Sequence, residues 1–320
     1  MNNTIQPLRI AQTCVKNTAN TQQRKLNFTN KFDNVELSTK PKMSKGKKAL
    51  IITGATIGAL AVTAGVITLV HKGYIKSIQK EGASIQEKAQ KVVDEFMEKF
   101  KNVQPLEDGT KVIEEFAQDG KTLARKATLD VDDFLTINDY ANKTRIEATK
   151  GDLDLFYKKV EFFEDNSYKC KELFFFNNRE LNGWYKNLQR NADDSGSYKK
   201  GVIFNDGKLQ GMIKNLQENA DDSFSYKKGV IFEDGKLSSL IKNQQQNADG
   251  SWSEARGINF KDGKLYRLTK NYKKNADGTW TADKDVRFKN GKLWHILKNY
   301  QKNADGTWSA DKDKYFGKNK

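Results

Sequence analysis

The sequence predicts a mainly β protein, a repetitive antiparallel β-hairpin meander of 28-residue repeats preceded by one transmembrane helix and one amphipathic helix. Three observations predict this fold class. The phrase FxDGKL and its variants recur at a constant step in the C-terminal half, each repeat contains two turn signals, and an uncharged apolar segment lies nearer the N-terminus. A fixed period over several copies indicates a repeat array in which each unit contacts its neighbours.

The chain begins with a basic tail. Residues 1–48 contain ten lysine or arginine residues against two acidic ones, and they are rich in asparagine, threonine and glutamine. No apolar period runs through this stretch, so we expect it to be disordered. A charge of +8 suits it to contact anionic lipid.

Residues 49–70, ALIITGATIGALAVTAGVITLV, predict a single transmembrane helix. They contain no charged residue, and 22 helical residues at about 1.5 Å each span a hydrocarbon core about 30 Å thick. A cleaved signal peptide or a buried soluble helix is the alternative, but the 48 preceding residues favour a retained span. The excess of lysine before the segment predicts a cytoplasmic N-terminus and external C-terminal repeats.

Small residues recur along one side of this predicted span. Spacings of four, three and four bring them onto one stripe, which would let two helices approach closely in lipid. The sequence thereby offers a homodimer through the membrane helix, although small residues are also common in membrane spans in general. The stripe consists of Gly54, Gly58, Ala61 and Gly65.

Residues 71–105 predict an amphipathic helix. Apolar residues at helical spacing share one face, with glutamate and lysine elsewhere. We expect Pro105 to end the helix and Gly82 to be a break between it and the span. The helix is either a stalk, paired with a second copy, or a cap on the first β-strands. Its apolar face consists of Ile85, Ala89, Val92, Phe96, Phe100 and Val103.

The rest of the chain predicts β-hairpins. Residues 109–172 contain irregular hairpins, and residues 173–320 contain five 28-residue repeats and a partial sixth. Asp-Gly or Asn-Gly in the first turn of four repeats, in the phrases NDG, EDG, KDG and KNG, predicts a type I′ hairpin, because this turn needs positive φ at both central residues. The second turn, NADG or NADD, predicts a four-residue loop. The repeating aromatic positions are Phe176, Phe204, Phe232, Phe260, Phe288 and Phe316.

The FxDGKL phrase resembles the bacterial variant of MORN repeats found in antitoxin-type proteins, in which an aromatic residue also precedes an Asn/Asp-Gly-Lys turn. The resemblance covers residues 173–320 and implies a sheet meander, with an antitoxin or immunity role as one functional expectation. The phrase NADGTW, at Asn275–Trp280 and Asn303–Trp308, is in addition similar to cell-wall-binding repeats of Gram-positive surface proteins.

Strand alternation predicts two faces for each hairpin. In the last repeat the face expected to be packed carries Trp280, Val286, Phe288, Leu293 and Leu297. The opposite face is expected to carry Trp294, Ile296, Lys298 and Tyr300.

A row of lysines on this second face is the candidate binding site. One lysine recurs at the same position of every repeat, and in the last two repeats aromatic residues are predicted beside it. Ammonium groups attract anions and aromatic rings offer stacking surface. The alternative is that the lysines keep the sheet soluble and the aromatic residues pack across strands. The candidate residues are Lys186, Lys214, Lys242, Tyr266, Lys270, Tyr272, Trp294, Lys298 and Tyr300.

No catalytic motif accompanies these repeats. The chain has two histidines and two cysteines, and it contains no HExxH, phosphate-binding glycine loop or zinc-type Cys/His spacing. We therefore predict a protein that is not an enzyme and uses no cofactor or metal. The predicted function is a membrane-anchored interaction or structural module, with membrane lipid and a protein among its partners. The alternative is a binder of an acidic cell-envelope polymer or another polyanion; nucleic acid is not favoured.

Overall fold

The computed structural model describes residues 45–149, 154–160, 169–191 and 195–316. Within these ranges the protein has one helix and one 17-stranded antiparallel sheet. The boundary between two compact units falls at Ala83–Ser84, inside the helix. The predicted tail, residues 1–48, lies almost wholly outside the described residues.

Helix α1, Lys45–Phe100, is continuous. The two predicted helices therefore form one, Gly82 does not break it, and it ends at Phe100, before Pro105. The side chains of α1 are described only from residue 73 onward. The predicted span and its small-residue stripe lie before that point and stay predictions. Where side chains are described, no helix is both long and apolar enough to cross a membrane.

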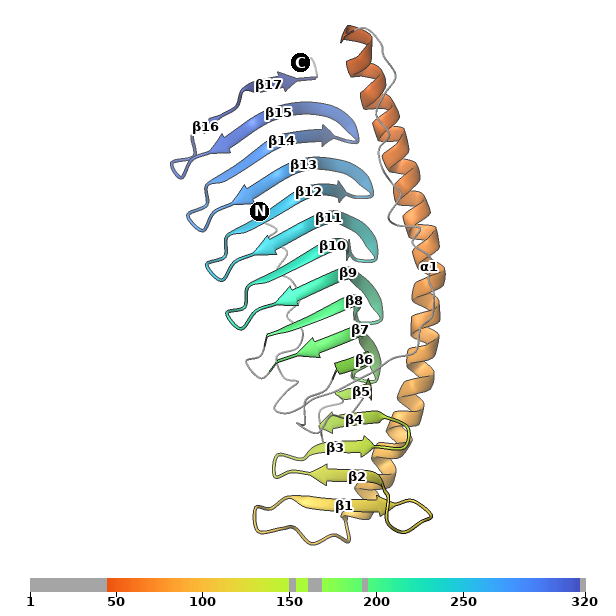
Figure 1. Cartoon of the computed structure of the whole chain (residues 1–320). Helices are drawn as coiled ribbons and strands as arrows, with labels where there is room; N and C mark the ends of the chain where they lie inside the picture. Colours follow the sequence, from red (N-terminus) through yellow and green to blue (C-terminus); the bar gives the residue numbers. More distant parts are fainter. Residues whose placement is uncertain (1–44, 150–153, 161–168, 192–194, 317–320) are drawn as a thin grey trace. The chain divides into compact units, whose positions relative to one another are not determined.

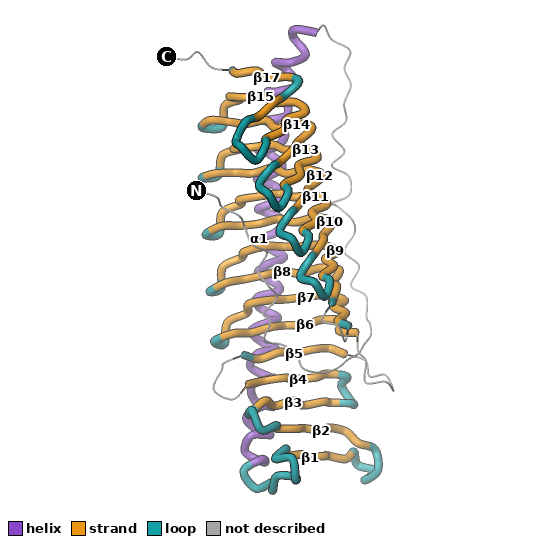
Figure 2. Tube along the Cα trace, turned by 90° about the vertical axis from the view of Figure 1, so that its left-hand side faces the viewer, coloured by secondary structure: helices purple, strands orange, loops and turns teal. Residues whose placement is uncertain are grey.

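From β1 to β16 the strands follow one another in chain order, each paired antiparallel with its predecessor (Figure 1), and β17 also pairs antiparallel with β15. Figure 2 shows loops along the two opposite edges of this meander. The sequence prediction of a β-hairpin meander is confirmed. The strands are β1 Lys111–Phe116, β2 Leu123–Leu129, β3 Phe134–Asp139, β4 Thr144–Thr149, β5 Leu155–Val160, β6 Lys169–Asn177, β7 Glu180–Arg190, β8 Gly196–Asn205, β9 Lys208–Glu218, β10 Phe224–Glu233, β11 Lys236–Gln246, β12 Trp252–Lys261, β13 Lys264–Lys274, β14 Trp280–Lys289, β15 Lys292–Lys302, β16 Trp308–Ser309 and β17 Lys312–Tyr315.

The last turns of α1 contact the first two strands. Phe96 is fully buried, and the guanidinium of Arg125 on β2 lies 5.0 Å from the centre of its ring. Arg125 also forms an ion pair with Glu95 at 3.1 Å. Lys99 pairs with Glu115 on β1 at 2.5 Å. This end of the helix therefore acts as a cap on the sheet, one of the two predicted alternatives.

The short turns of the repeats are type I′, as predicted. Asp206 and Gly207 have φ of 48° and 68° and connect the paired residues Asn205 and Lys208. Positive φ at both central residues matches the right-handed twist of the flanking strands. The later repeats place the same geometry at Asp234-Gly235, Asp262-Gly263 and Asn290-Gly291.

The NADGT loops have a different geometry from the predicted four-residue loop. The Asn303 amide donates to the Thr307 carbonyl at 2.9 Å, so three residues form the loop between them, and Gly306 has φ of 85°. The polar side chains of the phrase have structural roles: Asn303 donates to the Thr307 hydroxyl, and Asp305 accepts from the Thr307 amide at 2.8 Å. Hydrogen bonding from Thr307 lowers the pKa of Asp305. Turn chemistry thus explains the repeated phrase.

A β-bulge follows each type I′ turn of the repeats. In the last repeat Phe288 pairs with Leu293, but Arg287 pairs with His295. Trp294 is therefore the extra residue of the bulge. An extra residue changes which side chains share a face on the two sides of it.

Each regular repeat also contains an asparagine with positive φ inside its second strand. Lys298, just before Asn299, is exposed, whereas Tyr300, just after it, is 6% exposed. In a regular strand these two side chains would share a face. The positive-φ residue shifts the alternation and separates them. These asparagines are Asn187, Asn215, Asn243, Asn271 and Asn299.

The predicted faces of the last repeat are consequently wrong. Ile296 and Lys298 share a face with Val286 and Phe288, because Val286 pairs with Ile296 and Lys298 pairs with Lys284. We call this the outer face. The opposite, inner face carries Trp280, Asp285, Arg287, His295, Leu297 and Tyr300.

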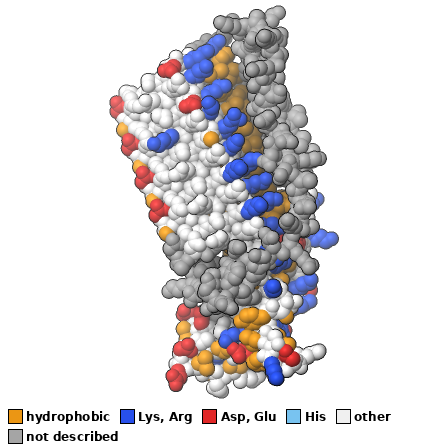
Figure 3. Space-filling view, in the orientation of Figure 1, with side chains coloured by type: hydrophobic (Ala, Val, Ile, Leu, Met, Phe, Trp, Pro, Cys, Tyr) orange, Lys and Arg blue, Asp and Glu red, His pale blue; other side chains and the backbone are white. Residues whose placement is uncertain are grey.

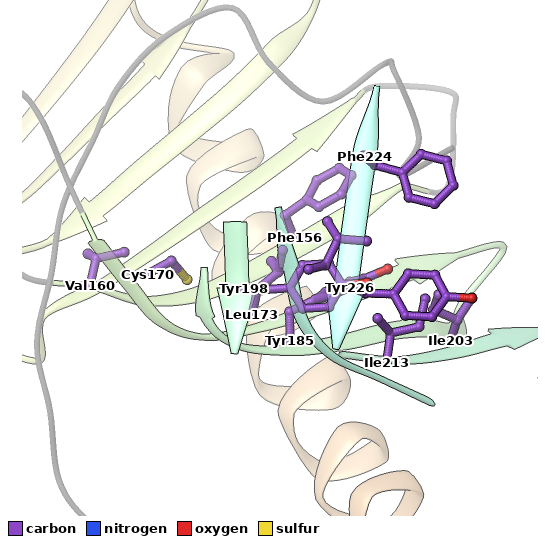
Figure 4. Packing of buried hydrophobic residues seen from close by; sticks show 11 residues of the cluster. Phe156, Val160, Cys170, Leu173, Tyr185, Tyr198, Ile203, Ile213, Phe224 and Tyr226 are labelled. Atoms are coloured by element: carbon purple, nitrogen blue, oxygen red, sulfur yellow. The ribbon is translucent and has the colours of Figure 1, made fainter. Parts of the chain in front are cut away.

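The strands bend toward the inner face, which carries one cluster of buried hydrophobic residues. The bend brings together two residues that are five positions apart on the same strand. The guanidinium of Arg267 lies 5.1 Å from the ring of Tyr272. The preceding repeats fill the bend with tyrosine, and a Cβ on Gly201 would lie 2.7 Å from the ring of Tyr198. Figure 4 shows the resulting cluster, which consists of Phe156, Val160, Cys170, Leu173, Tyr185, Tyr198, Ile203, Ile213, Leu216, Phe224 and Tyr226.

Candidate functional site

The outer face carries an unbroken row of basic residues across ten strand segments, which we call the basic ladder. Each member is the direct cross-strand partner of the next, from β7 to β17. Figure 3 shows the C-terminal part of this row in blue. The basic ladder consists of Lys186, Lys200, Lys214, Lys228, Lys242, Arg256, Lys270, Lys284, Lys298 and Lys312.

This arrangement concentrates positive charge along a line. Neighbouring strands are about 4.8 Å apart, and like charges directly opposite each other destabilise a sheet. Partial burial, together with the charges of Lys214 and Lys186, lowers the pKa of Lys200. The neighbouring basic side chains of the row therefore repel one another, and an anion bound along the row would reduce this repulsion.

Acidic residues lie close to members of the ladder, among them Lys186 and Lys270. Glu172 on β6 pairs with Lys186 at 3.6 Å, at the N-terminal end of the row. Burial opposes ionisation of Glu172, but the hydrogen bonds from Lys159 and Trp184 and the charges of Lys159 and Lys186 together outweigh it and lower the pKa of this carboxyl group. Asp283 lies 3.5 Å from Lys270, in a pair in which both side chains are about half exposed. From Lys242 onward every ladder residue is exposed.

Two further ladders flank the basic one on the outer face. On the side of the type I′ turns lies an apolar ladder, whose central members Met212, Val230 and Leu240 are half-buried. On the side of the NADGT loops lies a polar ladder, in which glutamine and serine or threonine mostly alternate. It consists of Gln189, Ser197, Gln217, Ser225, Gln245, Ser253, Lys273, Thr281, Gln301 and Ser309.

The five lysines of the candidate site all belong to the basic ladder, so their predicted common face is correct. The prediction missed the alternate members, which lie on the first strand of each hairpin: Lys200, Lys228, Arg256, Lys284 and Lys312. The signal was present in the sequence, because the ladder residues recur at a constant step of 14 positions. Half of a 28-residue repeat is 14 residues, and this number leads from a position on one strand to the directly paired position on the next strand.

The four aromatic candidates do not join the ladder. Tyr272 and Tyr300 are buried on the inner face, where the ring of Tyr300 lies 4.4 Å from that of Trp280. Tyr266 and Trp294 are exposed but occupy the bulges, away from the lysines. The predicted combination of lysine and aromatic side chains is therefore wrong. The shift in alternation at the positive-φ asparagines displaces Tyr272 and Tyr300, and the bulges displace Tyr266 and Trp294.

The inner face of the last repeats contains an ion network beside its tyrosine residues. Asp285 is fully buried and accepts hydrogen bonds from Arg267 at 2.9 and 3.0 Å and from Arg287 at 2.9 and 3.1 Å. Burial opposes the charge of Arg267, but the hydrogen bond and charge of Asp285, with the charges of Tyr272 and Glu254, together outweigh it and raise the pKa of Arg267. Because each of these three charges has a partner, we interpret the network as structural.

Among the described residues, no group of three or more histidine, cysteine, aspartate or glutamate side chains is placed to hold a metal. Cys170 is completely buried, and burial raises the pKa of its thiol to about 12. His295 is buried and contacts Asp313 at 2.5 Å. We therefore take the basic ladder as the candidate functional site.

Comparison with known proteins does not assign the chain to a family. No model of a known protein family matches the chain, and no curated protein matches it. The resemblance to MORN-like repeats, and the antitoxin or immunity role that it implies, stay predictions.

Proposed function

We propose that this protein is a non-catalytic binding module that holds an anionic partner along its basic ladder. One observation carries the proposal: ten basic residues are direct partners on successive strand segments. Keeping a sheet soluble requires scattered charge of either sign, whereas this row is of one sign and in register. Such a row focuses a positive potential along one line of the surface.

Neutralising the centre of the ladder is expected to weaken binding of a polyanion. In the full-length protein, held in a neutral detergent, Lys242, Arg256, Lys284 and Lys298 are replaced together by glutamine. Each exposed ion pair contributes on the order of 0.5 kcal/mol, so the four contribute about 2 kcal/mol, or roughly 30-fold in Kd. The measurement is fluorescence anisotropy of a labelled anionic polymer at low and at physiological salt.

The chain provides a matched control for this variant. Lys208, Lys236, Lys264 and Lys292 follow the type I′ turns, are exposed and lie outside the ladder. Their replacement by glutamine removes the same charge from the same array. If both variants lose affinity equally, binding depends on net charge alone and the ladder is not a site.

We also propose that residues 49–70 anchor the module in a membrane, with the N-terminus cytoplasmic and the repeats external. The support is the uncharged sequence of this segment and the continuous helical backbone of α1 through it. After carbonate washing of membranes from expressing cells, we expect the full-length protein in the pellet and a variant lacking residues 49–70 in the supernatant. Full-length protein in the supernatant would refute the anchor.

A further inference from the structure

We propose that the ligand of the basic ladder is an extended acidic polysaccharide with about one negative charge per sugar residue. This inference rests on the proposed function and names its ligand class. It is carried by two features of the outer face: the polar ladder that runs parallel to the basic ladder, and the spacing of the charges along the basic ladder.

The polar ladder supplies hydrogen-bonding groups beside every second charge. Gln217, Gln245 and Gln301 are exposed at corresponding positions of their repeats, and each lies three residues after a ladder lysine on the same strand. An amide both donates and accepts hydrogen bonds, and serine and threonine hydroxyls do the same. A ligand with only negative groups would use the lysines alone, whereas a ligand with hydroxyl groups between its charges would use both ladders.

The spacing of the ladder suits a polymer that crosses the strands. Successive ladder residues are separated by one strand spacing, about 4.8 Å. This is close to the length of one pyranose residue in an extended polysaccharide. A chain of uronic acid residues lying along the ladder therefore meets one basic side chain for each carboxylate, over the ten residues of the row.

The side chains that flank the ladder discriminate against single-stranded nucleic acid. Proteins that bind it combine positive charge with aromatic rings on which the bases stack. In the described strands β8 to β15, the rows on either side of the ladder are polar or aliphatic. The stacked rings of these repeats, such as Tyr272 and Trp280, lie on the inner face.

The test uses the full-length protein and four labelled probes: oligouronates with one carboxylate per sugar, neutral oligosaccharides of equal length, polyphosphate of equal charge, and oligodeoxythymidylate. We expect the oligouronates to bind most tightly, and their affinity to rise with length until about ten sugars cover the ladder. A triple variant, Gln217→Met, Gln245→Met and Gln301→Met, is expected to weaken oligouronate binding at least about 5-fold and to leave polyphosphate binding unchanged. Circular dichroism verifies that the variant folds.

The outcomes separate this inference from the proposed function. If the glutamine variant binds oligouronate like the wild type, or if polyphosphate or oligodeoxythymidylate binds more tightly than oligouronate, the polysaccharide assignment is overturned. A plateau of affinity at about two sugars would overturn it as well. If the four-residue ladder variant Lys242→Gln, Arg256→Gln, Lys284→Gln and Lys298→Gln binds every probe like the wild type, the proposed function itself fails.

Discussion

Replacement of Asp285 by asparagine is expected to destabilise the last repeats by about 3 kcal/mol. The carboxylate is fully buried and is the common partner of Arg267 and Arg287. Asparagine keeps the shape but removes the charge, which leaves two guanidinium groups without their counter-ion. Breaking a buried ion pair from one side typically costs about 3–5 kcal/mol, and the partial exposure of both arginines places the expected cost at the lower end. Urea unfolding followed by tryptophan fluorescence measures the loss.

The preceding repeat supplies the control for this variant. Twenty-eight residues earlier, the three positions are Ser239, Gly257 and Asn259, and Ser239 donates a hydrogen bond to Asn259 at 2.8 Å. The triple variant Arg267→Ser, Asp285→Gly and Arg287→Asn therefore introduces the uncharged residues that the preceding repeat has at the same three positions. We expect it to lose less stability than Asp285→Asn alone. A triple variant less stable than the single one would contradict the interpretation that the unpaired charges cause most of the destabilisation.

Replacement of Phe96 by alanine is expected to detach the end of helix α1 from the sheet, at a cost of about 3–5 kcal/mol. The ring is fully buried and lies under the guanidinium of Arg125. Its removal leaves a cavity and takes away the apolar surface on which this arginine rests. The expected signature is faster amide hydrogen exchange in β1 and β2, together with a lower unfolding midpoint.

Phe116 provides a control of the same residue type nearby. It lies at the end of β1 and is 52% exposed, so Phe116→Ala removes an identical side chain without opening a cavity. Exposed positions of this kind usually change stability by less than about 0.5 kcal/mol. Equal effects of the two substitutions would show that residues 84–100 do not cap the sheet.

Local chemistry explains why so much of the architecture could be predicted. The 28-residue period, the type I′ turns and the antiparallel meander depend on residues close together in the chain, above all Asp-Gly and Asn-Gly pairs such as Asp206-Gly207. The buried helix residues Ala89, Phe96 and Phe100 likewise follow from helical spacing alone. The common face of the lysines at a step of 28 required only that the repeats keep phase.

Other features depended on tertiary structure. Asparagine at positive φ within β15 and the bulge at Trp294 each shift the alternation, and the sequence pattern alone does not reveal where such a shift occurs. These two irregularities place Tyr300 in the core and Lys298 at the surface.

The sequence by itself determined the repeat, its turns and the fact that each repeat consists of β-strands, because each of these features is encoded within a few neighbouring residues. Only the tertiary structure decided that lysines from both strands of every hairpin form one ladder. That result depends on cross-strand register, through pairs such as Lys284 with Lys298. Register is set jointly by turn, bulge and bend, and a shift of one residue would move every ladder side chain to the opposite face.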